Sequence, residues 1–129
     1  MKQWTLVTVL LLGLIAILPA SAAEPGTSAK ILLQSSLLAG FRYYEGKKLW
    51  SEIKVGDALQ LVREPGNSYD ANAVRVEWQG HKLGYVPRAD NEALARFMDR
   101  GSKAEARITR LKKSRNPWQR MEFEVYLGL

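Results

Sequence analysis

Residues 61–76 read LVREPGNSYDANAVRV, an apolar run, then a polar turn, then a second run that alternates apolar and polar residues. Pro65 presets the backbone angle φ, while Asn67 and Asp70 tolerate left-handed or Asx-type backbone. The stretch therefore predicts two strands joined by a shaped loop. Because Tyr69 and Asp70 fall in that loop, we expect an aromatic ring and a carboxylate at the rim of a sheet, within reach of a ligand.

Further strands are predicted on both sides of this loop. Period-two alternation continues to Trp78, Gln79-Gly80 reads as a tight turn, and the chain then returns as a partner strand. A slip in apolar parity between Ile108 and Leu111 predicts a bulge. The expected strands are residues 31–41 with a bend at Gly40, 49–53, 58–63, 73–78, 82–86, 104–111 and 120–127.

One clear helix is predicted, at about residues 90–100. Asp90 is suited to cap its N-terminus and Gly101 to follow its C-terminus, and the apolar residues between them recur at helical spacing. About six short strands with one helix predict a mostly β chain. We expect a small antiparallel barrel of the OB-like or SH3-like kind.

The first residues predict an export signal. Lys2 supplies a positive charge, residues 6–18 are apolar and uncharged, and Ala20-Ser21-Ala22 is a small-residue cleavage motif. The apolar stretch is shorter than the roughly 20 residues that span a bilayer, and retention as an anchor is the alternative. We expect an apolar signal helix over residues 1–22, a flexible lead-in over 23–30, one domain over 31–129, only transient membrane contact, and a periplasmic or secreted protein.

Composition excludes several kinds of chemistry. The 129-residue chain has no cysteine, one histidine and a formal net charge of +6. Thiolate nucleophiles, thiolate-bound zinc and His–Cys metal clusters are therefore excluded, and the chain has no phosphate-binding Gly-Lys-Ser/Thr loop. We expect no catalytic residue, metal or cofactor, and hence no enzyme, although a hydrolase built on Glu64 and Asp70 stays open. The positive charge favours an anionic partner.

Three groups of residues are candidates for binding such a partner. They are the cation and ring of Arg42 and Tyr43, the loop around Tyr69, and Tyr85 and Arg88 together with a basic loop that holds Trp118. Aromatic rings stack on unpaired bases, and Arg and Lys contact phosphates. For the loop, the alternative is structural.

That alternative concerns the polar residues of the loop. Asp70 and Asn72 can instead cap the turn through bonds from side chain to backbone. A structural role is also the alternative for one of the adjacent tyrosines Tyr43 and Tyr44. If their segment is a strand, one of the two side chains must point inward, into the core.

The motifs and their spacing resemble a HIRAN domain. The resemblance lies in Gly40-Phe41-Arg42-Tyr43-Tyr44, in residues 61–76, and in Lys82-Leu83-Gly84-Tyr85-Val86-Pro87-Arg88, and it covers roughly residues 34–128. HIRAN domains are modified OB-like barrels that stand alone in bacteria and are fused to fork-remodelling helicase-like ATPases in eukaryotes. The resemblance implies a domain that grips the 3′ end of single-stranded DNA.

The resemblance also implies a role for each candidate residue. Arg42 and Tyr43 match the positions that contact phosphate and stack on a base. Tyr69 matches a second stacking ring, and Asp70 matches the carboxylate that reads the terminal 3′-hydroxyl. The remaining matches are Asn67 and Asn72 in the loop that shapes the pocket, Arg88 at a basic phosphate contact, Tyr85 where the remodellers carry a histidine, and Trp118 at an aromatic of the last hairpin loop.

Two functions follow from these observations. The first is a monomeric nucleic-acid-binding module for single-stranded 3′ ends, without catalysis. The second is an exported envelope protein that uses the same groove for an acidic glycan, a lipid head group or a peptide, because an exported protein rarely meets genomic DNA.

Overall fold

The computed structural model describes residues 3, 13 and 29–129, with the exception of the Trp118 side chain. Apart from residues 3 and 13, the expected signal peptide over residues 1–22 lies outside the described residues, as does most of the lead-in. Lys30, expected to end the lead-in, instead begins the first strand. Within the described part of the chain, no helix is long and apolar enough to cross a membrane, and no group of His, Cys, Asp and Glu residues is placed to hold a metal ion.

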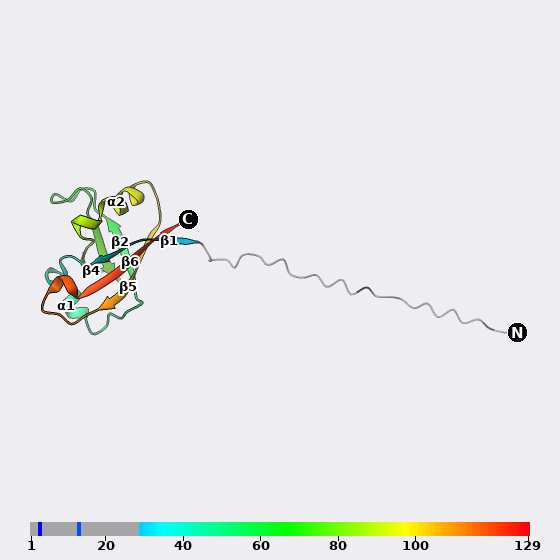
Figure 1. Ribbon diagram of the computed structural model, residues 1–129, viewed down its shortest axis with the longest axis horizontal. Coiled ribbons are helices and arrows are strands. Elements are labelled where there is room, and N and C mark those ends of the chain that lie inside the picture. The colour runs from blue at the N-terminus through cyan, green and yellow to red at the C-terminus, as the bar shows by residue number, and fades with distance from the viewer. Residues whose placement is uncertain (1–2, 4–12, 14–28) are drawn as a thin grey trace.

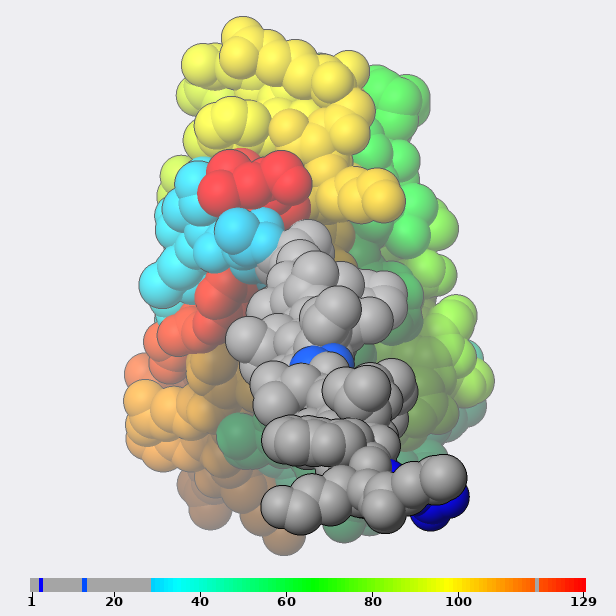
Figure 2. All heavy atoms as spheres, turned by 90° about the vertical axis from the view of Figure 1, so that its right-hand side faces the viewer, coloured from blue at the N-terminus to red at the C-terminus, as the bar shows by residue number. Residues whose placement is uncertain are grey.

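Six antiparallel strands form one sheet, with the order β1-β6-β5-β2-β3-β4 (Figure 1). In Figure 2, β1 and the C-terminal end of β6 lie side by side, in agreement with the pairing of Lys30 with Gly128. The strand bounds are β1 Lys30–Leu37, β2 Ala58–Arg63, β3 Val74–Trp78, β4 His81–Tyr85, β5 Ala104–Leu111 and β6 Met121–Gly128. The mostly β, six-stranded architecture expected from the sequence is confirmed.

The two edges of the sheet meet at one point. Ala39, just after β1, forms a single antiparallel bridge with Tyr85 at the end of β4, through two backbone hydrogen bonds of 2.9 Å. This approach requires a glycine in β4, because a Cβ at Gly84 would overlap the carbonyl oxygen of Ala39. The sheet is thus a small barrel-like fold, closed next to Tyr85.

The apolar alternation of the strands faces the interior. In β6, every second residue from Met121 to Leu127 is buried, and in β3, Val74, Val76 and Trp78 are buried. A one-residue slip would turn each of these side chains to solvent, so the pattern fixes the register. The bulge predicted in β5 is confirmed by a register shift between Ile108 and Arg110.

Short helical segments connect the strands. They are η1 Phe41–Tyr43, α1 Gly46–Leu49, η2 Arg88–Asp90, α2 Glu92–Asp99 and η3 Pro117–Gln119. The predicted helix is confirmed as α2, although its N-cap is Asn91, because Asp90 ends η2. Gly101 follows α2 with φ of 90°, as expected of a residue that ends a helix.

The expectations for residues 37–53 need two corrections. The first strand ends at Leu37, because Gly40 has a φ of 78° and turns the chain into η1. The strand expected over 49–53 is wrong, since α1 and a turn occupy that segment. The apolar residues there reflect core packing, because the Trp50 ring packs edge-on against the buried Phe41 ring at 5.6 Å.

Candidate functional site

A groove of about 660 Å³ lies between the β2–β3 loop and the end of β4. Five of the sequence-predicted residues line it: Asn67, Tyr69, Asp70, Tyr85 and Arg88. The other lining residues are Ala39, Tyr44, Ser68, Ala73, Lys82 and Val86. The groove therefore lies beside the point where the sheet closes.

Side chains within the β2–β3 loop fix the shape of its backbone. The Asn67 Oδ1 atom accepts hydrogen bonds from the backbone N–H groups of Tyr69, at 2.9 Å, and Asp70, at 3.2 Å. Asp70 Oδ1 accepts from the backbone N–H of Asn72 at 2.9 Å. The capping role left open by the sequence is thus confirmed for Asp70, whereas Asn72 takes part through its backbone N–H, and Asn67 provides the other side-chain cap of the turn. As a result, the loop holds the Tyr69 ring out of the core, 88% exposed.

Asp70 is also tied to the N-terminus of α2. Its Oδ2 atom accepts a 2.6 Å hydrogen bond from Nδ2 of Asn91, a polar residue that is buried. Arg88 Nε lies 4.0 Å from the same oxygen. A carboxylate offers about four acceptor positions, and these neighbours leave capacity for a ligand hydroxyl. Asp70 therefore serves both as a structural link and as an oriented acceptor in the groove.

A chain of polar contacts links Lys82 and Tyr85, which line the groove, to Glu64 and Arg75 behind them. The Lys82 Nζ atom donates to the Tyr85 hydroxyl at 2.7 Å, and that hydroxyl donates to Glu64 Oε1 at 3.0 Å. Arg75 Nη1 donates to Glu64 Oε2 at 2.6 Å. Lys82 Nζ also lies 4.1 Å from the centre of the Tyr44 ring, at cation–π distance. The Lys82 ammonium group thus lies close to two aromatic rings that line the groove, those of Tyr44 and Tyr85.

The ionisation of Glu64, Lys82 and Tyr85 follows from their contacts. Burial acts to raise the pKa of Glu64, but hydrogen bonds from Asn67, Arg75 and Tyr85 outweigh it, and the pKa is below its ordinary value. Burial acts to lower the pKa of Lys82, but the bond to Tyr85 and nearby negative charge hold it above the ordinary value. Burial raises the pKa of Tyr85. At neutral pH Glu64 is therefore a carboxylate, Tyr85 a phenol and Lys82 an ammonium.

Arg42 and Tyr43 lie in a neighbouring hollow of about 250 Å³, which Gly40, Phe41 and Pro117 also line. The Arg42 guanidinium lies 4.7 Å from the centre of the Tyr43 ring, and Arg42 Nη2 donates to the Tyr43 hydroxyl at 2.6 Å. Tyr43 and Tyr69 thus line different hollows and do not form one slot. The cause lies in the backbone after η1: Tyr43 is the last residue of that turn, whereas Tyr44 has extended backbone with φ of −124° and ψ of −159°.

Tyr44, and not Tyr43, is the tyrosine of this segment that lines the groove. Tyr44 lines it, half-buried, and its ring packs edge-on against the Tyr85 ring at 5.9 Å. Of the remaining candidates, Asn72 lines neither of these two hollows. Its backbone N–H donates to the Asp70 carboxylate. The Trp118 side chain lies outside the described part of the structure.

Sequence reasoning missed Lys82 because of a bulge in β4. Arg75 pairs with Tyr85 and Val76 with Gly84, but Glu77 pairs with Lys82, so one extra residue stands in β4. Lys82 and Tyr85 are three apart and belong to opposite faces of a regular strand. The extra residue brings both into the groove, a placement for which the sequence carries no periodic signal.

Comparison with known proteins shows the family and the fold. The HIRAN domain family model matches residues 31–129. The chain belongs to the HIRAN domain family. The barrel is similar to a crystal structure of a protein from Lactobacillus plantarum, with a TM-score of 0.70 and 32% identity over 78% of this chain and 97% of that one. It is also similar to the HIRAN domain of human HLTF, with a TM-score of 0.60 and 25% identity over 77% and 78% of the two chains.

Two curated relatives are similar over part of their length. The Fanconi-associated nuclease 1 homolog of Oryza sativa subsp. japonica is 30% identical over 77 residues, 57% of this chain and 8% of that protein. The helicase-like transcription factor of Oryctolagus cuniculus is 36% identical over 63 residues, 48% of this chain and 6% of that protein. The HIRAN domain chain thus covers less than a tenth of either relative.

Proposed function

We propose that this HIRAN domain is a nucleic-acid-binding module that takes the 3′ end of a single strand into the groove beside β4. One observation carries the proposal: an exposed aromatic ring, an oriented carboxylate and two cations line the same groove. The names of the curated relatives, a nuclease homolog and a helicase-like transcription factor, support nucleic acid as the ligand class. Their enzymatic activities are not carried over to this chain.

In the proposed complex, the terminal base stacks on the Tyr69 ring. Such stacking is worth about 1–3 kcal/mol per base. Arg88, whose side chain is 78% exposed, contacts a phosphate, and Lys82 adds positive charge from below. Asp70 accepts a hydrogen bond from the free 3′-hydroxyl, because a carboxylate attracts a hydroxyl and repels a phosphate.

The next nucleotide lies in the proposed complex at Arg42 and Tyr43. In the free protein the guanidinium covers one face of the Tyr43 ring. The ring is 68% exposed, so a base can stack on its other face. This pairing leaves the Arg42 charge close to the phosphate that joins the two nucleotides.

The proposed function is binding without catalysis. A general acid or base works best with a pKa near the working pH. The pKa of Glu64 is instead displaced downward, and its oxygens accept hydrogen bonds from three neighbouring residues. These features suit a carboxylate that supports the groove.

The test varies the ligand, because substitutions at Asp70 would also release the loop from Asn91. Fluorescence anisotropy is measured with short single strands that end in a 3′-hydroxyl or a 3′-phosphate, and with a circular single strand. The proposal predicts the tightest binding for the hydroxyl end, and a slope of log K against log salt near −0.7 for each phosphate contacted. Equal affinity for all three strands would refute end recognition, and no binding at low salt would refute nucleic acid as the ligand.

A location follows from the leader expected over residues 1–22. We propose that the domain is exported, and that its ligand is nucleic acid outside the cytoplasm.

A further inference from the structure

A third hollow, of about 260 Å³, lies between α1 and the β5–β6 connection. Its lining residues are Lys47, Trp50, Lys113, Ser114 and Arg120, so three cations line it and no carboxylate does. We name it the α1 hollow. Its composition is that of a site for an anion with several negatively charged oxygens.

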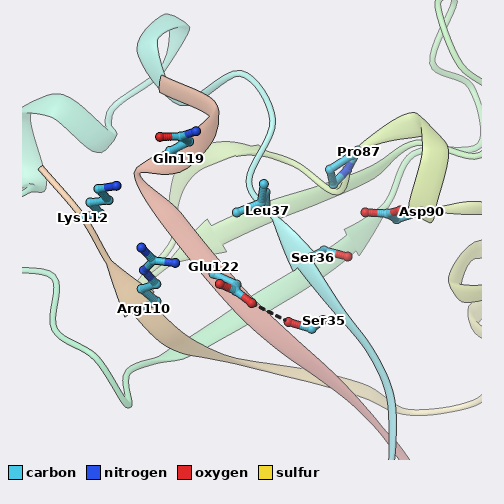
Figure 3. A pocket seen from close by; sticks show the side chains of 9 residues that line it. All are labelled: Ser35, Ser36, Leu37, Pro87, Asp90, Arg110, Lys112, Gln119 and Glu122. Carbon is cyan, nitrogen blue, oxygen red and sulfur yellow. Dashed lines mark hydrogen bonds between the residues drawn. The ribbon is translucent and has the colours of Figure 1, made fainter. Parts of the chain in front are cut away.

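A larger hollow elsewhere on the barrel lacks this character. The 620 Å³ hollow drawn in Figure 3 has Arg110 and Lys112 on its wall, but Asp90 and Glu122 balance these charges. Figure 3 also shows Glu122 turned toward Ser35, whose hydroxyl donates to it at 3.0 Å. An anion entering there meets two carboxylates, whereas an anion entering the α1 hollow meets none.

The cations of the α1 hollow are available to a ligand. Arg120 is half-buried and oriented, because its Nε donates to the Ser114 carbonyl oxygen at 2.9 Å and its guanidinium lies 5.5 Å from the Phe41 ring centre. Lys47 and Lys113 are exposed, and neither forms an ion pair with any residue of the described part of the chain. Three like charges around one hollow repel each other until an anion enters.

The α1 hollow continues a line of hollows along residues 39–41. Ala39 lines the main groove, and Gly40 and Phe41 line the hollow of Arg42 and Tyr43. The Phe41 ring in turn packs against Trp50 and lies under Arg120, both of which line the α1 hollow. The three hollows are therefore neighbours, and a strand that leaves the main groove past Arg42 can reach the α1 hollow.

We propose that the α1 hollow binds the phosphodiester backbone of the same strand, on the 5′ side of the nucleotides held at the groove. The proposal rests on the proposed function, because it takes the groove as the place of the 3′ end. The contacts are to phosphate, so this part of the footprint is independent of base sequence. The strand therefore makes contacts beyond its two terminal nucleotides.

The experiment compares two strand lengths and two double variants. Anisotropy is measured with 3′-hydroxyl strands of two lengths. One has about 3 nucleotides, fewer than the roughly 4–16 that a single OB fold binds, and the other has about 10 nucleotides, within that range. The test variant is Lys47→Ala with Lys113→Ala. The control is Arg100→Ala with Lys103→Ala, which removes the same charge just after α2, at the end of the barrel opposite α1 (Figure 1).

The proposal predicts a loss that depends on strand length. Two lost phosphate contacts reduce the salt slope for the long strand by about 1.4, roughly 25-fold in affinity at 0.1 M salt. The affinity of the test variant for the short strand stays within about twofold of that of the unmodified protein. The affinity of the control variant stays within the same limit for both strands. Circular dichroism melts confirm that the variants are folded.

Two results would overturn the proposal. Unmodified protein that binds both lengths equally, or a test variant that weakens both lengths equally, leaves the α1 hollow without a role while the groove keeps its function. If the unmodified protein binds neither strand, the proposed function fails together with this inference.

Discussion

Replacing Tyr69 with Ala separates binding from stability in this domain. The Tyr69 ring is 88% exposed, so its removal takes almost nothing from the core and changes the free energy of unfolding by less than about 0.5 kcal/mol. The same ring provides the proposed stacking surface, worth about 1–3 kcal/mol per base. The account therefore predicts a loss of affinity of about 5- to 150-fold for a 3′-hydroxyl strand, with unchanged thermal stability.

The assay is anisotropy with a short 3′-hydroxyl strand, paired with thermal melts of each variant. Tyr69→Phe is the matched control, because it keeps the ring and the Tyr69 hydroxyl makes no hydrogen bond to any described residue. Tyr126→Ala removes a ring from another hollow, beside β5, and should bind normally. The reasoning is refuted if Tyr69→Ala binds as tightly as Tyr69→Phe, or if Tyr69→Ala melts several degrees lower.

Three further predictions concern the support of the groove and the leader. The pKa of Glu64 is depressed on folding, so Glu64 stabilises the fold above its ordinary value of 4.5 and this contribution is lost as pH falls through the lower, folded value. Urea denaturation from pH 7 to pH 3 should therefore show a smaller acid loss for Glu64→Gln, and an identical loss would contradict the hydrogen-bond assignment. Asn91→Ala removes the hydrogen bond to the Asp70 carboxylate and should cost about 1.5–3 kcal/mol of stability and weaken preference for the 3′-hydroxyl; an unchanged preference would mean that Asn91 does not orient Asp70. Expression of the full 129-residue chain should give a mature protein that begins near Ala23 by mass spectrometry, and a mass that retains residues 1–22 would contradict the proposed cleavage.

Periodicity and turn chemistry predicted most of the sheet. β3 and β6 alternate apolar and polar residues, and one face of each is buried as expected. Gln79 and Gly80, at φ of 46° and 82°, form the tight turn read from the sequence. These features are local, so a single sequence carries them in full.

Features set by tertiary contacts were not predictable in this way. The segment at 49–53 has the apolar content of a strand. In the structure, however, Trp50 lies in a turn after α1, and its ring packs against Phe41. Asn91 gives no sign in the sequence that its side chain reaches across to Asp70.

The candidate site shows the same division. The polar loop from Glu64 to Asn72 was recognised from its composition, and both alternative roles of Asp70, loop cap and groove residue, are compatible with its contacts. Which of Tyr43 and Tyr44 lines the groove was not predictable, because a 3₁₀ turn stands where the sequence predicts a strand. Lys82 was not predicted as a groove residue, because its position depends on the bulge in β4.

The most direct test of the central claim is an NMR titration of the ¹⁵N-labelled domain with a short 3′-hydroxyl single strand. The account predicts amide shifts concentrated at Tyr69, Asp70 and Arg88, together with Arg42 and Tyr43, and little change along β1. Shifts centred instead on the hollow beside Arg110 and Glu122, or no shifts at low salt, would contradict the claim that the groove beside β4 binds nucleic acid.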